Sequence, residues 1–304
     1  MTGPRIDERP MAGSPTRVAL LGTGKMGSAI ASRLAAAPFD LTVWNRTRAR
    51  AEGLGMGRVA ATPAAAVRDA DIVISSLTGP EALRATFLGP EGAVRGATDQ
   101  LFIEMSTGGP DIVSELESFL RPTGARLVDA PIVGSPAAVR LGQAAIVVGG
   151  EPADVERAAT VLRTVSEVRH VGPLGSGARL KLVANSMLGD VILAAAELQV
   201  AGEAAGIDRD EVFWVLQRYA PALEARRDGL LEGRDAPPLF ALRDLAKDLD
   251  LANDLFGRSA SHIPVTSLAR SLVTQDARAT GELDIASVIR AYRSGASAGN
   301  ADAA

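Results

Sequence analysis

The sequence predicts an α/β protein: a doubly wound, mostly parallel sheet in the N-terminal half, then an all-α C-terminal domain that begins with a long interdomain helix. Three observations lead to this class. Short apolar runs alternate with helical patterns up to about residue 171, a proline-free stretch of 29 residues follows, and no convincing strand comes after His170–Val171. Nearly continuous apolar strands that alternate with helices are typical of a parallel sheet covered by helices on both faces.

The N-terminal half contains six clear strand patterns, each a short apolar run bounded by glycine or polar residues. We expect strands at Arg17–Gly22, Leu41–Trp44, Ala70–Leu77, Leu101–Met105, Ala125–Ala130 and Gln143–Gly150. Apolar residues three and four apart predict helices between them, at Lys25–Ala37, Pro110–Arg121 and Glu151–Val165.

The C-terminal half is helical throughout. The stretch Ala178–Gly206 predicts one helix of about 43 Å, and its apolar residues occupy almost the whole circumference, which indicates a helix buried between layers. Further helices are expected at Asp208–Tyr219 (with Asp208 as its N-cap), Ala241–Phe256, Ile263–Ala279 and Asp284–Arg293. We therefore divide the chain into a disordered tail (1–16), a dinucleotide-binding domain (17–174), an all-α substrate and oligomerisation domain (175–294) and a second disordered tail (295–304).

Composition narrows the class of function. The chain has 304 residues, 47% of them hydrophobic, and its net charge of −4 comes from interspersed charges of both signs. Such a surface predicts no nucleic-acid or membrane partner. With no cysteine and only two histidines, a metal site is not expected. The polar N-terminus has no apolar run typical of a signal peptide, and we expect a cytoplasmic protein.

A glycine pattern lies between the first predicted strand and the first predicted helix: Gly22-x-Gly24-x-x-Gly27. In this setting the first glycine permits a tight turn, the second lets the backbone approach a pyrophosphate, and the third lets the helix pack closely on the strand. The amino end of the helix attracts the anion. The N-terminal half is therefore predicted to be a Rossmann domain, with the loop residues Thr23, Lys25 and Met26 also at the cofactor.

The residues after the second strand indicate which dinucleotide binds. An acidic residue there would hold the ribose hydroxyls of NAD, but this chain has Asn45, Arg46 and Thr47. The guanidinium of Arg46 would attract a 2′-phosphate, which a carboxylate would repel. We predict NADP, with NADPH preferred over NADH. The alternative is that Arg46 and its neighbours Arg48 and Arg50 are merely solvated.

At this point the chain resembles the β-hydroxyacid dehydrogenase family, of the 3-hydroxyisobutyrate dehydrogenase type, which is related to the imine reductases. The likeness runs from about Arg17 to Arg293. Five motifs carry it in the family's order: "GTGKMG", "EMST" (Glu104–Thr107), "DAPIVGS" (Asp129–Ser135), "GSGARLKLVAN" (Gly175–Asn185) and the looser "AKDLDLA" (Ala246–Ala252).

The resemblance implies a function and a set of site residues. Lys181 would be the general acid and base of a hydride transfer between NADPH and a small carbonyl compound, and Asn185, one helical turn on, would assist it. Val133, Gly134, Ser135 and Lys247 would contact substrate. Lys247 would bind the carboxylate of the substrate and would also contact the cofactor. Further cofactor contacts would come from Leu77, Thr78, Ser106 and Thr107. Members of the family also pack as homodimers or homotetramers.

One motif departs from the family. In "DAPIVGS", Val133 stands where the family has a serine whose hydroxyl holds the substrate carboxylate, and Ser135 stands where it has a glycine. Valine cannot donate a hydrogen bond, so a bulkier or less acidic carbonyl compound, or an imine, becomes a reasonable substrate. Two alternatives stay open: an imine reductase, against which Lys181 and Asn185 argue, and a non-catalytic dinucleotide-binding scaffold, against which the presence of Lys181 argues.

Overall fold

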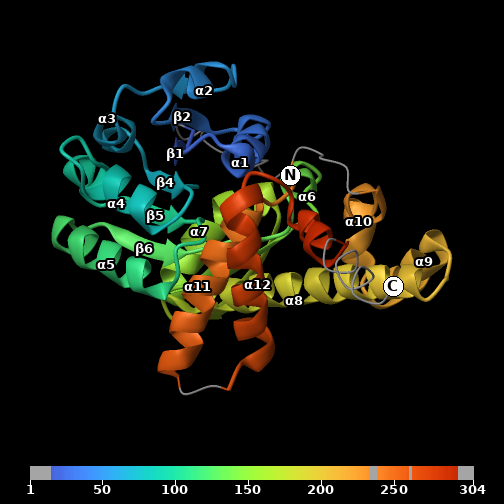
Figure 1. The fold of residues 1–304 in the computed structure, drawn as a ribbon. Helices are drawn as coiled ribbons and strands as arrows, with labels where there is room; N and C mark the ends of the chain where they lie inside the picture. Colours follow the sequence, from blue (N-terminus) through green and yellow to red (C-terminus); the bar gives the residue numbers. More distant parts are fainter. Residues whose placement is uncertain (1–14, 233–237, 260–261, 294–304) are drawn as a thin grey trace, which may run out of the picture.

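The computed structural model describes residues 15–232, 238–259 and 262–293, and it has a sheet half and a helical half (Figure 1). The tails expected at 1–16 and 295–304 lie outside the described residues, apart from Pro15 and Thr16. The α/β class, with a Rossmann-type sheet followed by helices, is confirmed.

The sheet has the order β3-β2-β1-β4-β5-β6-β8-β7, with β9 also paired to β8. The pairs from β3 through β6, and β8 with β9, are parallel, whereas β8 runs antiparallel to β6 and β7. The strands are β1 Arg17–Leu21, β2 Asp40–Trp44, β3 Arg58–Val59, β4 Ile72–Ser75, β5 Leu101–Glu104, β6 Arg126–Asp129, β7 Ile132–Val133, β8 Ala145–Gly149 and β9 Glu167–Gly172. The chain order reverses between β1 and β4, and such a switch point opens a crevice where ligands bind.

Three of these strands were not predicted, for two physical reasons. β3 and β7 have two residues each, which is too short for a periodic pattern. β9 is an outer strand of sequence EVRHVG, and most of its side chains reach solvent. An exposed strand of this kind has no need of the apolar run by which the central strands were found.

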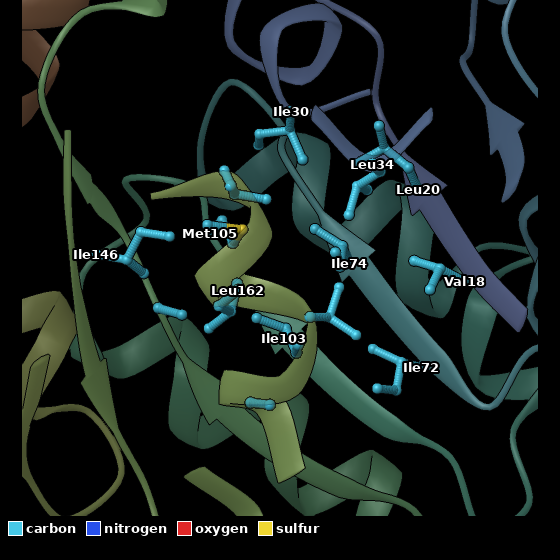
Figure 2. Packing of buried hydrophobic residues seen from close by; sticks show 14 of the residues in the cluster. Val18, Leu20, Ile30, Leu34, Ile72, Ile74, Ile103, Met105, Ile146 and Leu162 are labelled. Atoms are coloured by element: carbon cyan, nitrogen blue, oxygen red, sulfur yellow. The ribbon is translucent and has the colours of Figure 1, made fainter. Parts of the chain in front are cut away.

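Helices cover both faces of the sheet because side chains alternate along the central strands. Val18 and Leu20 of β1 point to one face and Ala19 and Leu21 to the other. Figure 2 shows the first face, where Ile30, Leu34 and Leu162 of the covering helices meet the strand residues. The helices of this half are α1 Lys25–Ala35, α2 Arg48–Glu52, α3 Pro63–Arg68, α4 Pro80–Leu88, α5 Pro110–Leu120, α6 Pro136–Arg140 and α7 Pro152–Val165.

The helical half is built around α8, which spans Ser176–Ala204 and has 29 residues, as the sequence predicts. A third apolar cluster joins it to the helices that follow. These are α9 Arg209–Tyr219, α10 Arg227–Glu232, α11 Leu242–Arg258 and α12 Pro264–Thr280. Asp208 caps α9 as expected, its carboxylate accepting from Asp210 N at 2.9 Å. The last predicted helix begins as a 3-10 turn, Ile285–Val288, capped by Asp284.

The expectation that α8 is buried all round was wrong for one of its faces. Leu180, Val183 and Met187 are 39%, 48% and 63% exposed. They lie three and four residues apart, so they form one stripe along the helix. Among the described helices α8 alone is long and apolar enough to cross a membrane, yet it packs on β8, α9, α11 and α12 as a core helix. Its apolar circumference therefore reflects one face packed in this chain and one face left open.

Candidate active site

The glycine loop between β1 and α1 has a shape that only glycine permits at two positions. Gly22 has a φ of 104°, and a Cβ on it would collide with the Ser76 carbonyl oxygen. A Cβ on Gly27 would collide with the Gly22 carbonyl oxygen. Gly24, in contrast, has open space beside it. The loop is thus closed against the protein and open at the point where a pyrophosphate would approach.

Two polar groups of this loop bear on a dinucleotide. Thr23 N donates to Asn45 Oδ1 at 3.1 Å, so Asn45 joins the loop to the end of β2. The Thr23 hydroxyl is buried and has no hydrogen-bond partner within the described residues. A buried hydroxyl without a partner is costly, and a phosphate oxygen of the cofactor would accept its hydrogen. The loop therefore fits a dinucleotide.

The residues after β2 are open to solvent. Arg46 and Thr47 are exposed, and Asn45 Nδ2 holds the turn by donating to Thr47 O at 3.0 Å. Arg48 pairs with Glu52, whereas the ion pairs of the described residues do not include Arg46. The guanidinium of Arg46 is thus available to an anion at the end of β2.

Lys181 and Asn185 are four residues apart and share a face of α8 that is turned away from the exposed stripe. Lys181 is partly buried, and this loss of hydration lowers the pKa of its ammonium from 10.5 to about 8. The negative charge of Asp248 opposes the shift and the positive charge of Lys247 adds to it. A lysine with a pKa of about 8 exchanges its proton readily near neutral pH.

A network of side chains surrounds Lys181 and ends on the sheet half. Asn185 Nδ2 donates to Asp248 Oδ2, and Lys247 forms an ion pair with the other oxygen of Asp248, which is 2% exposed. Lys247 Nζ also donates to Thr107 O at 2.8 Å. The stem of Lys247 lies against Gly79, where an added Cβ would be 3.1 Å from Lys247 Cδ. Lys247 thus spans from α11 to the loops after β4 and β5. Its predicted role of holding a substrate carboxylate or the cofactor stays a prediction, because Asp248 already neutralises its charge.

The loops after β4 and β5 hold each other in place. Ser106 Oγ accepts from Leu77 N at 2.8 Å, and Glu104 Oε1 accepts from Ser106 N at 2.6 Å. Burial raises the pKa of the Glu104 carboxyl to about 8. Thr78 follows in the first of these loops and is exposed. These contacts place Leu77, Thr78, Ser106 and Thr107 at the same edge of the sheet as the glycine loop.

The segment Val133–Ser135 connects β7 to α6. Ile132 belongs to the core of the sheet half, so strand alternation turns Val133 to the opposite face, where α8 packs against β7. Gly134 has a φ of 149°, and a Cβ on it would be 2.8 Å from Ala144 Cβ. Ser135 Oγ caps α6 by accepting from Ala138 N at 3.2 Å. The Ser135 oxygen is therefore engaged, while its hydrogen remains available to donate.

The sequence analysis did not single out three carboxyl groups that the structure buries near the site, those of Glu104, Asp129 and Asp248. One usable signal was overlooked, namely the scarcity of lysine. The chain has only three lysines, and arginine carries its other basic charges. All three lie where the two halves meet: besides Lys181 and Lys247, Lys25 Nζ donates to Pro238 O at 2.6 Å. In the described part of the chain no group of three or more His, Cys, Asp or Glu is suited to a metal ion.

A sheet with a dinucleotide loop, strand-end loops tied together at its switch point, and a partly buried lysine of lowered pKa beside them are features typical of dinucleotide-binding oxidoreductases. Comparison with known proteins points to the same class of protein. Residues 17–172 match the family of the NAD binding domain of 6-phosphogluconate dehydrogenase, and residues 175–292 match the NAD-binding domain of NADP-dependent 3-hydroxyisobutyrate dehydrogenase. The chain belongs to the β-hydroxyacid dehydrogenase family.

Relatives of two kinds are similar to the chain. An uncharacterized oxidoreductase of Synechocystis is 31% identical, with 91% of this chain and 98% of the relative covered. The cytokine-like nuclear factor N-PAC of Danio rerio is 30% identical over 91% of this chain, but the chain spans only 62% of that protein's length. Among solved structures, 3-hydroxyisobutyrate dehydrogenase of Mycobacterium tuberculosis with L-serine has a TM-score of 0.80 at 25% identity, covering 92% of this chain and 99% of the other. An imine reductase of Myxococcus stipitatus shares the fold, with a TM-score of 0.62 at 23% identity, 91% and 99% covered.

Proposed function

We propose that the protein is an NADP(H)-dependent oxidoreductase that transfers hydride between NADPH and a small carbonyl compound, a semialdehyde or keto acid, or the corresponding hydroxy acid. The observation that carries the proposal is Lys181, a partly buried lysine with a pKa of about 8 on the helix that follows the sheet with the glycine loop. In this proposal residues 17–174 bind the dinucleotide, and residues 175–294 hold the substrate and the contact between subunits.

The bound nicotinamide supplies the hydride in reduction and accepts it in oxidation. The role of the chain is to place the substrate and move one proton. Lys181 Nζ donates a proton to the carbonyl oxygen as that oxygen gains negative charge, and takes it back in the reverse direction. Asn185, whose Nδ2 is held by Asp248, keeps its amide oxygen free to orient Lys181 or a substrate hydroxyl.

The substrate is tested by following NADPH oxidation against a panel of semialdehydes, keto acids and cyclic imines. Turnover of the aldehydes or keto acids, with the reverse reaction on the hydroxy acids, is the expected result. Turnover of imines alone would replace the proposal by the imine reductase alternative, which the apolar Val133 favours. Binding of NADPH without turnover of any compound would favour the non-catalytic scaffold.

The preference for NADPH rests on Arg46, which is exposed at the end of β2 and free of ion pairs there. Arg46→Ala should weaken the binding of NADPH about tenfold, because one charge-assisted contact to phosphate is lost, and should weaken the binding of NADH much less. Arg58→Ala, which removes an exposed arginine of β3 that pairs with Asp40, is the matched control. An unchanged ratio of the two dissociation constants in Arg46→Ala would contradict the assignment.

We also propose that the chain forms a homodimer or homotetramer through its helical half. The support is the exposed stripe on α8, together with Val265 and Leu268 of α12, which are 63% and 61% exposed. Large apolar side chains exposed in this number on two helices are typical of association surfaces. The small-molecule substrate and a second copy of the chain are thus the partners proposed.

A further inference from the structure

Asp129 is a buried carboxylate at the carboxyl end of β6, and it holds the first turn of α8. Its Oδ1 accepts from Gly175 N and its Oδ2 from Ala178 N, both at 2.6 Å, and the residue is 0% exposed. The first N–H groups of a helix have no partner inside the helix. Here one carboxylate from the sheet half satisfies two backbone N–H groups at the start of the longest helix of the other half.

Two glycines allow this contact. A Cβ on Gly149 of β8 would collide with Asp129 Oδ1, and a Cβ on Gly177 of α8 would lie 2.5 Å from Val147 O and 2.9 Å from Asp129 Oδ2. Real Cβ atoms do not approach other atoms so closely. The start of α8 is therefore packed end-on against β6 and β8 with no room for sliding.

Asp129 also begins the segment that leads to Val133. On α8, Lys181 comes three residues after Ala178, about 4.5 Å along the helix axis, and four residues before Asn185, about 6 Å. Lys181 thus lies between two fixed points, the Asp129 contact on one side and the Asn185–Asp248 contact on the other.

We propose that Asp129 is a positioning residue: it joins the start of the catalytic helix to the start of the substrate segment and so sets the place of Lys181 relative to Val133. The inference rests on the proposed function for the meaning of these two segments. Asp129 is 0% exposed and both of its oxygens are engaged by backbone N–H groups, so in this proposal it acts through the first turn of α8 and not by contact with a ligand.

The test measures Lys181 without any substrate. Trace acetylation of the full-length protein at a series of pH values, read by mass spectrometry, gives the titration of each amine, and the three lysines are easily told apart. In the native protein Lys181 should titrate near pH 8. The side chain of Asp129→Asn can accept only one of the two N–H bonds, so the first turn should loosen and admit water. Because water favours the charged ammonium, the measured pKa of Lys181 should rise by about one unit.

Asp208→Asn is the matched control, since it makes the same change at the N-cap of α9. It should leave Lys181 unchanged. A lower melting temperature of Asp129→Asn with no change in the titration of Lys181 would overturn the proposal, because a merely structural role predicts that pattern.

A second variant covers the case in which Asp129→Asn does not fold. Gly177→Ala keeps the carboxylate of Asp129 but displaces the first turn of α8, and it should also raise the measured pKa of Lys181. Gly257→Ala adds a methyl group in open space on α11 and should leave that pKa unchanged. An unchanged Lys181 in folded Gly177→Ala overturns the proposal equally. Because labelling needs no substrate, failure of the proposed function would show separately, as absence of turnover in the native protein.

Discussion

The two faces of α8 reverse the usual distribution of polar and apolar residues. One face holds the partly buried ammonium of Lys181 and the buried amide of Asn185, while the other exposes Leu180, Val183 and Met187. The surroundings of Lys181 disfavour its charged form, since they lower the pKa of its ammonium from 10.5 to about 8. The two faces match the two roles proposed for this helix, proton transfer on one and association on the other.

The largest expected effect on the contrast between the two faces of α8 comes from removing the ammonium of Lys181. Lys181→Ala should lower the turnover number at least about a hundredfold, because the carbonyl oxygen loses its proton donor. NADPH affinity, measured by fluorescence titration, should stay within about twofold. Lys181→Arg serves as the control for charge, since arginine keeps the charge but does not release its proton near neutral pH. Activity of Lys181→Ala equal to that of the native protein would contradict the proposed catalytic role of Lys181.

The pH dependence of the same face gives the next largest effect. In the proposed reaction, reduction requires protonated Lys181, so its rate should fall about tenfold between pH 7 and pH 9, on either side of a pKa of about 8. Oxidation requires the neutral amine, and its rate should rise over the same range. Glu104 also has a pKa of about 8, and Glu104→Gln shows whether the inflection belongs to it. A flat profile in both directions would contradict the assignment to Lys181.

Asp248 should have a smaller effect, through the charge of Lys181. Its carboxylate raises the pKa of Lys181, so Asp248→Asn should move the inflection of the reduction rate below pH 8 and reduce the rate severalfold at pH 7.5. Asp250→Asn changes an exposed aspartate of the same helix, paired with Arg270, and is the matched control. An inflection that stays at the native pH in Asp248→Asn would show that the two groups are not coupled.

The sequence predicts the two faces unequally well. Lys181 and Asn185 are four residues apart in an apolar helix, so their shared face follows from helical geometry, and the order of the glycine loop, strand ends and long helix places them at the cleft. Asp248 could not be singled out in the same way. It stands in a segment with Asp244, Asp250 and Asp254, where all the carboxylates look equally solvated.

Only the docking of α11 on α8 distinguishes Asp248 from its neighbours, by burying it beside Asn185. Asp129 was hidden for a related reason. Its partners, Gly175 N and Ala178 N, are backbone groups of a segment 46 and 49 residues away. Side-chain patterns report which face of an element is buried, but a long-range bond to a backbone N–H leaves no such pattern. The open stripe of α8 was misjudged because apolar side chains give the same sequence pattern whether the chain buries them or leaves them at its surface.

The smallest effect on turnover is expected on the exposed face. Met187→Glu puts a charge in the middle of the stripe, and burying that charge between two copies would cost several kcal/mol, so the homo-oligomer should dissociate. The fold of the single chain should tolerate the change within about 0.5 kcal/mol, because Met187 is 63% exposed. Light scattering after size exclusion measures the mass, and Phe119→Glu, an exposed apolar residue of α5, is the control that should leave it unchanged. An unaltered mass in Met187→Glu, or a native protein that is already monomeric, would mean that this face of α8 is exposed for another reason and that the comparison between its two faces rests on Lys181 alone.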